Sequence, residues 1–402
     1  MTRARAWALA AVLAAASSAT LPAPLSAQSL RLGDDVRITP KARLDTDIRG
    51  ASSVDHDDDV DLDLARRRIG VTGTVTSRIE FEVEREVGPD GRWRDVFVDG
   101  RVKRGLQIRA GHFKVPFSRE QLTGPGGLDF IDRSRAVDLL APGRSAGVAL
   151  HGRVADRVVG YEAGAFVRDG TRGLAAPADS EPTVAARLTI RPRGSARRAG
   201  SLADLEVGVG AAASELVEGR SSLRGRRTTN EVFFAPVLVS GRRLRVGGDL
   251  DWRPGPFGVR AEFLRADDAR QHQGLLGETL PPLRAQGWYV SGVWAVAGRQ
   301  AHAKANDRRL AVAGLAGLEL AVRAESLSFG TPGAAASQLW TPRAEQLSTV
   351  TDRVWTFGVN WTVNRLVRLQ ANAVREAVVD RSRGAAPPRA AWSSVARIQV
   401  AM

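Results

Sequence analysis

The side chains of this sequence that could do chemistry are mainly arginines, many of them at every second position of segments whose other positions are apolar. Around Arg243 and Arg245, for example, the apolar residues Leu244 and Val246 alternate with the guanidinium groups. A guanidinium group offers forked donors that match phosphate-like oxygens, and rings of such groups favour anions in a pore. The residues that we expect to line a pore or to bind anions are Arg101, Lys103, Arg109, Lys114, Arg119, Arg133, Arg135, Arg144, Arg187, Arg243, Arg245 and Arg368.

The same basic residues could instead be neutralised by carboxylates on the same polar faces. Further arginines expected on these faces are Arg191, Arg260, Arg323 and Arg397. The acids expected there are Glu80, Glu82, Glu84, Asp249, Asp251, Glu262, Glu319 and Glu325. Pairing would remove the anion-binding role of any single arginine, whereas the summed positive field is less sensitive to it.

Other kinds of site find little support in the sequence. The chain has no cysteine, and no two of its five histidines stand at metal-ligand spacing. The acidic run 55–61 lacks the glycine and the terminal glutamate of a calcium-binding EF-hand loop, so a solvated charge run is expected. Residues 143–147 match G-x-S-x-G, but a turn precedes them and a strand is predicted after them, unlike a nucleophile elbow. We therefore predict no enzyme, no metal site and no cofactor.

The elements that must position the arginines are strands. In residues 78–84 and 355–363 apolar and polar residues alternate, which is the pattern of a strand with two different faces. Such segments run about 9 to 13 residues, which suits tilted membrane strands better than the shorter strands of soluble sandwiches. The predicted strands are 36–48, 62–76, 78–87, 93–104, 105–113, 146–153, 157–167, 183–192, 203–213, 242–252, 256–266, 285–297, 314–327, 352–363, 365–376 and 392–402.

The links between these strands alternate in length for most of the chain, as they do in outer-membrane barrels with short periplasmic turns and longer extracellular loops. An even strand number places both ends of the barrel on the periplasmic side. We therefore predict an all-β fold, a transmembrane antiparallel β-barrel of sixteen strands. The segment 231–240 could alter this count, and the longest link, 114–145, spans 32 residues. A loop of that length is usually functional or disordered.

The N-terminus predicts export. Arg3 and Arg5 precede the apolar run 6–16, which is too short to span a bilayer, and small residues follow it. We predict a signal peptide over 1–27, with cleavage after Ala27 or alternatively after Ala19, and a single barrel domain over 28–402. The net charge of +14 suggests anionic partners such as permeating solutes or lipopolysaccharide. Export argues against nucleic acid, and a G+C-rich genome would also favour arginine.

One block of the sequence resembles the signature of the phosphate-selective porin O and P family. It comprises GHFKVPFSREQLT at 111–123, LDFIDRS at 128–134, PGR at 142–144 and GVALHG at 147–152, with a further similar hairpin, GVNWTVN and VRLQ, at 358–370. The resemblance implies a homotrimer of sixteen-stranded barrels in the outer membrane of a Gram-negative bacterium, in contact with its lipid and lipopolysaccharide. It also implies a lumen lined by Arg and Lys, with the third loop, 114–145, folded inward as a constriction.

Two other functions remain open at this point. The long loops would permit a barrel with a blocked lumen that acts as a structural element or an adhesin. A barrel hydrolase would need a cluster of Ser, His and Asp, or a carboxylate pair, at the rim, and the sequence places none there. The leading prediction is a passive, anion-favouring diffusion channel for small solutes such as phosphate.

Overall fold

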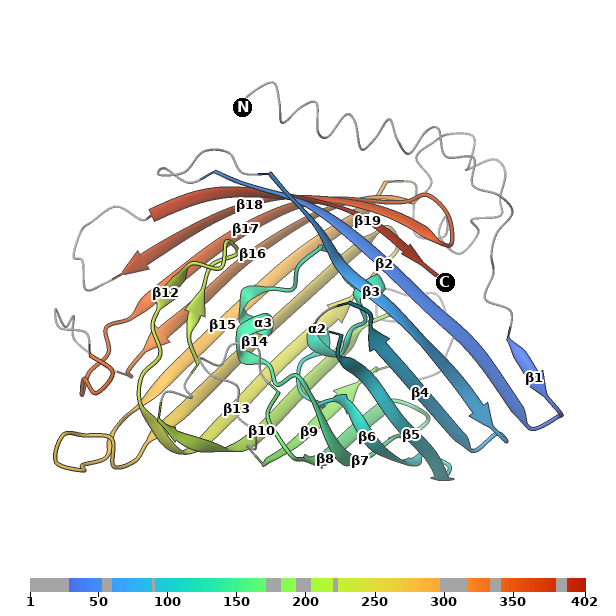
Figure 1. Cartoon of the computed structure of the whole chain (residues 1–402), viewed down its shortest axis with the longest axis horizontal. Helices are drawn as coiled ribbons and strands as arrows, with labels where there is room; N and C mark the ends of the chain where they lie inside the picture. Colours follow the sequence, from blue (N-terminus) through green and yellow to red (C-terminus); the bar gives the residue numbers. More distant parts are fainter. Residues whose placement is uncertain are drawn as a thin grey trace.

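The computed structural model describes residues 29–52, 60–88, 91–170, 182–192, 204–219, 223–296, 317–332, 341–380 and 389–402. Within these ranges the chain forms a closed antiparallel β-barrel of sixteen strands with very little helix (Figure 1). The predicted signal peptide, 1–27, and the acidic residues 55–59 lie outside the described residues. In the described part of the chain, no helix has the length and apolar character needed to cross a membrane.

The barrel strands follow one another around the wall in chain order. They are β2 (Val36–Ser52), β3 (Val60–Val75), β4 (Ile79–Glu86), β5 (Trp93–Lys103), β6 (Leu106–Lys114), β7 (Arg144–Val154), β8 (Val159–Phe166), β9 (Thr183–Ile190), β10 (Glu206–Gly219), β13 (Val239–Trp252), β14 (Phe257–Arg270), β15 (Leu280–Ala295), β16 (Leu318–Gly330), β17 (Val350–Thr362), β18 (Val367–Asp380) and β19 (Arg389–Ala401). Each overlaps one predicted segment, so the sixteen-stranded barrel is confirmed. Shorter elements are β1 (Leu30–Leu32), β11 (Gly225–Arg226) and β12 (Val232–Phe234).

Several strands extend beyond their predicted bounds toward the long links. β14 reaches Arg270, whereas the prediction ends at 266, and β15 begins at Leu280 instead of 285. The outward positions in these extensions carry charged residues such as Asp267 and Arg284, so the apolar alternation ends before the hydrogen-bonded ladder does. The segment 231–240 adds no barrel strand, because β12 pairs only with β11.

The barrel closes by pairing its first and last strands. β19 runs antiparallel to β2, with Ala401 opposite Arg43. The backbone N–H of Met402 donates to the carbonyl oxygen of Ala42 at 3.0 Å, which continues the ladder to the last residue. A sheet closed in this way has no free edge in its wall, as a membrane environment requires.

The two faces of the wall differ in polarity. Leu244 and Val246 on β13 are 53% and 52% exposed, whereas Arg243 and Arg245 on the same strand are at most 2% exposed. Because side chains alternate across a strand, the arginines face the interior and the apolar residues face outward. This distribution is the reverse of that in a water-soluble sandwich, and it matches a barrel whose outer surface contacts lipid.

Candidate functional site: the arginine-lined interior of the barrel

The link between β6 and β7 packs against inward-facing residues of the barrel wall. It includes the short helices α2 (Arg119–Leu122), η1 (Pro125–Gly127) and α3 (Arg135–Leu140). Helix α3 packs against β14, β15 and β16. Val137 and Leu140 are fully buried there, in one apolar cluster with inward-facing residues such as Leu264 and Phe329. Apolar burial therefore fixes this part of the link to one side of the wall.

Polar contacts attach the same link to other strands. The Asn360 amide on β17 donates to the Asp129 carbonyl oxygen at 2.8 Å, and the Ile131 N–H donates to Asn372 Oδ1 on β18 at 2.8 Å. On β19 the Arg397 guanidinium donates to the Ile131 carbonyl oxygen at 3.1 Å. Inward side chains of three consecutive strands thus form hydrogen bonds with backbone groups of a segment that has little secondary structure of its own.

The predicted link 114–145 is slightly shorter in the structure. Lys114 and Arg144 lie opposite each other as the last and first residues of β6 and β7, so the link runs from 115 to 143. The Lys114 ammonium donates to the carbonyl oxygens of Leu122 and Thr123, at 3.0 and 3.1 Å. Arg144 forms a two-pronged ion pair with Asp95, at 3.1 and 2.7 Å. Both basic groups therefore have partners at the base of the link.

The three basic residues predicted within the link also have partners. Arg119 pairs with Glu206 and, at 2.5 Å, with Asp251. Arg133 donates to the backbone carbonyl oxygens of Glu120 and Thr123, at 3.0 and 2.8 Å. Helix residue Arg135 donates to backbone carbonyl oxygens in the β11 region and lies 3.8 Å from Asp138.

Arginines on β9 and β13 form buried ion pairs. Arg187 holds Asp249 by two hydrogen bonds of 2.6 and 2.8 Å and also donates to the Phe117 carbonyl oxygen. Arg243 binds Asp268 at 2.6 and 2.8 Å, and both Arg243 and Arg245 contact Asp169, at 3.0 and 2.7 Å. The oppositely charged groups of each pair stabilise one another. Because these side chains are buried, they are hardly accessible to a mobile ion.

The remaining predicted residues differ in their surroundings. Arg109 pairs with Asp99 at 2.8 Å, and its guanidinium carbon lies 4.7 Å from the ring centre of Phe97. Arg368 donates to two carbonyl oxygens of the link and lies 4.0 Å from Glu319. Arg101 and Lys103, near the end of β5, are exposed.

The link also carries an acid whose charge is fixed by a strand arginine. Asp132 accepts two hydrogen bonds from the Arg49 guanidinium on β2, at 2.8 and 3.1 Å. Burial alone would raise the pKa of Asp132, but hydrogen bonding and attraction to Arg49 outweigh it and lower the pKa below its ordinary value. The carboxylate is therefore ionised at neutral pH and offsets part of the positive charge of the interior.

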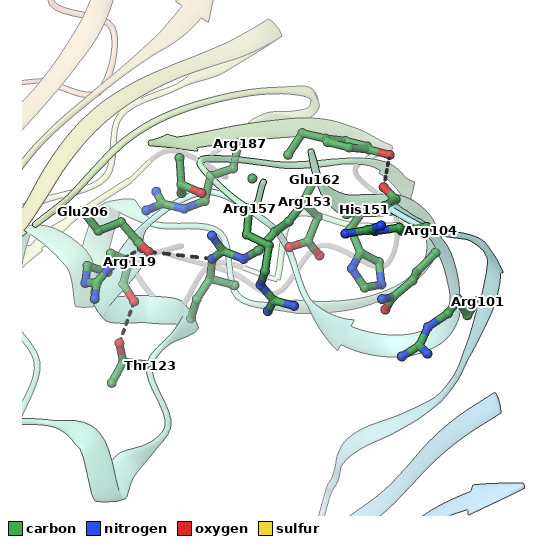
Figure 2. Close-up of a pocket in the computed structure, with 17 residues that line it drawn as sticks. Arg101, Arg104, Arg119, Thr123, His151, Arg153, Arg157, Glu162, Arg187 and Glu206 are labelled. Carbon is green, nitrogen blue, oxygen red and sulfur yellow. Dashed lines mark hydrogen bonds and ion pairs between the residues drawn. The ribbon is translucent and has the colours of Figure 1, made fainter. Parts of the chain in front are cut away.

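A cavity of about 810 Å³ lies between β5–β10 and helix α2, at the end of the barrel with short turns. Figure 2 shows the charged side chains that surround it. Its lining contains six arginines and only two glutamates, with His151 beside them. These charged residues are Arg101, Arg104, Arg119, Arg153, Arg157, Arg187, Glu162 and Glu206. The imbalance gives this cavity a positive potential.

Three of the cavity arginines differ from the buried pairs described above. Arg101, Arg104 and Arg157 are exposed, and within the described residues none of them forms a side-chain hydrogen bond or ion pair. By contrast, Glu206 contacts Arg119, Arg191 and, at 3.7 Å, Arg153. The charges available to a mobile ion are therefore concentrated in the three exposed side chains.

Sequence patterning found only part of this lining. Arg101, Arg119 and Arg187 were predicted, whereas Arg104, Arg153 and Arg157 were not. Arg104 and Arg157 lie in the turns between β5 and β6 and between β7 and β8, where period-two alternation assigns no face. The signal that could have identified them is the repeated presence of arginine in short turns on the same rim.

Other chemistry is not evident in the described ranges. There, no group of three His, Asp or Glu side chains is arranged to hold a metal ion. Ser145 of the G-x-S-x-G match lies in β7, and its hydroxyl contacts only backbone groups, the Ala146 carbonyl and the Arg168 N–H. His151, on the same strand as Ser145, contacts Asp99 of β5 at 2.8 Å and not Ser145.

Comparison with known proteins agrees with this architecture. The model of the family described as phosphate-selective porin O and P matches residues 36–401. The chain belongs to the phosphate-selective porin O and P family. It is thus an outer-membrane porin channel, and both family and fold are those of a channel rather than an enzyme. No curated protein matches this porin significantly in sequence.

Solved structures similar to the porin share its fold at low sequence identity. The outer-membrane protein OmpT of Vibrio cholerae is 12% identical, with a TM-score of 0.58 over 93% of this chain and 100% of that one. An anion-selective porin from Comamonas acidovorans is 12% identical, with a TM-score of 0.57 over 92% and 100%. The channel DcaP of Acinetobacter baumannii is 10% identical, with a TM-score of 0.58 over 93% and 99%.

Proposed function

We propose that this porin is a passive diffusion channel that favours small anions such as phosphate. The observation that carries the proposal is the cavity, whose lining has six arginines and two glutamates. Three of these arginines, Arg101, Arg104 and Arg157, have no carboxylate partner in the described chain. The anion selectivity stated for the similar Comamonas acidovorans porin supports it. The family's description as phosphate-selective suggests a phosphate-like solute.

In the proposed mechanism, the cavity must attract a permeating anion without binding it tightly. A cavity lined by one sign of charge concentrates counter-ions of the other sign. Conduction also requires that the ion leave, so exposed guanidinium groups that share the ion with water suit the task. The buried pairs such as Arg187 with Asp249 contribute to the shape of the passage, while Arg101, Arg104 and Arg157 supply its charge.

The test is the reversal potential of single channels in a planar bilayer under a KCl gradient, followed by addition of phosphate. We expect chloride preference, and a chloride current that falls when phosphate is added. The triple variant R101Q/R104Q/R157Q should lose most of this preference. The matched control is R365Q, because Arg365 is an exposed arginine at the β17–β18 turn outside the cavity lining. Unchanged selectivity in the triple variant would contradict the proposal.

We further propose that the link 115–143 sets the narrowest part of the passage. Its contacts with strands from β10 to β19 and with β2 support this role. Replacing residues 118–134 by a short Gly-Ser linker should raise single-channel conductance. Equal conductance before and after the replacement would show that another segment limits the flow.

One observation favours a second candidate, a barrel with a blocked lumen. The apolar cluster of the interior joins the link to a second inward segment through Leu223, Phe234 and Val237. Such packing could close the passage on the side of the long loops. A folded, reconstituted protein without measurable conductance would favour this structural or adhesive barrel over the channel.

We also infer that the porin is exported with a cleaved signal peptide and assembles as a homotrimer in contact with outer-membrane lipid and lipopolysaccharide. One solved form of the Vibrio cholerae OmpT is described as a trimer, which supports the assembly. Cleavage after Ala27 predicts that the mature protein begins at Gln28, and cleavage after Ala19 predicts Thr20. The intact mass of the membrane-extracted protein distinguishes these, and light scattering in detergent gives the subunit number.

A further inference from the structure

The outer surface of the barrel carries charged residues at the upper end of its apolar band, on the side of the long links. On β14 and β15, Asp267 accepts hydrogen bonds from Arg265 and Arg284, at 2.8 and 2.7 Å. On β10 and β13, Glu215 pairs with Arg242 at 3.2 Å. These outward arginines have carboxylate partners on the same surface.

Two outward arginines on β17 and β18 lack such partners among the residues that the structure describes. Arg353 and Arg375 are exposed, and neither forms a side-chain hydrogen bond or an ion pair with any described residue. Arg353 stands opposite Ala377, two residues from Arg375, so the two side chains are diagonal neighbours on the outward face. The neighbouring acids Asp352 and Glu376 are buried on the opposite, inward face.

Tryptophans flank Arg375 on both sides. Trp355 on β17 and Trp392 on β19 are its direct register partners, and they are 47% and 48% exposed. Figure 1 shows β17, β18 and β19 side by side in the wall. Tryptophan is enriched where a membrane protein passes from the hydrocarbon core to the headgroup region. The row Trp355–Arg375–Trp392 therefore places Arg375 at headgroup depth.

The residues below this row show where the hydrocarbon begins. Phe357 and Val359 continue the outward face of β17 and are 48% and 44% exposed. A guanidinium group just above such a band extends its charge toward the headgroups, because burying it in hydrocarbon would be costly. Because no carboxylate of the described residues pairs with them, the two guanidinium groups present many donors to one area of the surface.

We propose that Arg353 and Arg375, bracketed by Trp355 and Trp392, form a binding site for the phosphate of an anionic lipid in the leaflet that faces the long loops. Paired guanidinium groups match phosphate oxygens, and the indole rings pack against the adjoining apolar part of the lipid. The occupant is a phosphorylated lipid, since a free phosphate ion would gain nothing from the tryptophans. This site lies on the outer face and is independent of the proposed anion passage.

The test compares lipid binding by the full-length mature porin in detergent, using native mass spectrometry with bisphosphorylated lipid A as the probe. The variant R353Q/R375Q should bind the probe at least about 10-fold more weakly, because it loses charge-assisted hydrogen bonds to the phosphate. Enzymatically dephosphorylated lipid A should bind the wild-type porin at least about 10-fold more weakly as well. The control R365Q removes an exposed arginine from the opposite end of the same strand pair and should bind like the wild type.

Two further measurements keep the result interpretable. R353K/R375K retains both charges without the forks and should bind with intermediate affinity, even if the glutamine variant folds poorly. Competition by millimolar inorganic phosphate should leave the wild-type lipid complex intact. Equal lipid affinity in the wild type and R353Q/R375Q would overturn the site, and so would loss of the lipid to inorganic phosphate. Conductance measured on the same samples tests the proposed channel function independently of lipid binding.

Discussion

Arg243 illustrates how single charges are held in the interior of this barrel. It is fully buried, and its guanidinium group contacts Asp268 and Asp169. Removing a buried charge from water is costly, and hydrogen-bonded partners of opposite charge offset that cost. One residue earlier, Arg242 pairs with Glu215 on the outer surface, where both side chains are more than half exposed. The stability of the barrel should therefore depend much more on Arg243 than on its neighbour Arg242.

This difference predicts the stability of two matched variants. Arg243→Ala leaves two buried carboxylates with fewer partners and should lower the free energy of unfolding by about 3–5 kcal/mol. Arg242→Ala removes an exposed pair and should change it by at most about 1 kcal/mol. Denaturant titration of each refolded protein in detergent micelles measures both values. Similar losses in the two variants would mean that the interior pair is as well solvated as the outer one.

At the scale of the strands, β6 contains a backbone position that only glycine fits well. Gly111 has a φ of +133°, and a Cβ atom there would lie 2.2 Å from the Val96 carbonyl oxygen on β5. It begins the motif block 111–123, just before the chain leaves the wall for the link. The glycine thus allows β5 and β6 to stay in close register where the link begins.

A second prediction follows for glycines in strands. Gly111→Ala should destabilise the barrel by about 1–3 kcal/mol, because the new methyl group meets backbone and the φ value is strained. Gly292→Ala on β15 is the control, since a Cβ there has no heavy atom closer than Val322 Cγ1 at 3.9 Å. Thermal unfolding of both variants, followed by circular dichroism, is the measurement. If G111A were as stable as G292A, β5 and β6 would be able to move apart at this position without a loss of stability, and the prediction would be wrong.

At the scale of the whole molecule, the net charge of +14 is distributed unevenly between paired and accessible groups. Many interior arginines are held in ion pairs, whereas the exposed cavity arginines Arg101, Arg104 and Arg157 have no such partner among the described residues. Exposed charges are screened by salt, over a Debye length of about 10 Å at 0.1 M and about 3 Å at 1 M. Selectivity produced by these groups should therefore depend on ionic strength.

The third prediction concerns this salt dependence. The ratio of chloride to potassium permeability should be highest in dilute KCl, around 0.1 M, and approach one near 1 M. Reversal potentials measured at a fixed twofold gradient across this range give the ratio. In R101Q/R104Q/R157Q the ratio should stay near one throughout. A wild-type ratio that does not change with salt would point to a buried, unscreened binding site instead.

The sequence by itself determined the wall of the barrel. Alternation in segments such as 78–84 assigned one face of each strand to lipid and the other to the interior, and counting the segments predicted the sixteen strands. This information is local, because side-chain direction in a strand repeats every two residues. The same alternation placed Arg187, Arg243 and Arg245 on the interior face, where the structure has them.

Only the tertiary structure decided which of these arginines are neutralised and which remain accessible. Arg397 is held by Asp47, 350 positions away, because closure of the barrel makes β19 a neighbour of β2. The path of the link 115–143 places Arg119 in the lining of the cavity and brings the Phe117 carbonyl oxygen to Arg187. Arg104 and Arg157 come together from two separate turns. Strand register and loop path depend on contacts between distant residues, and a period-two pattern contains no information about them.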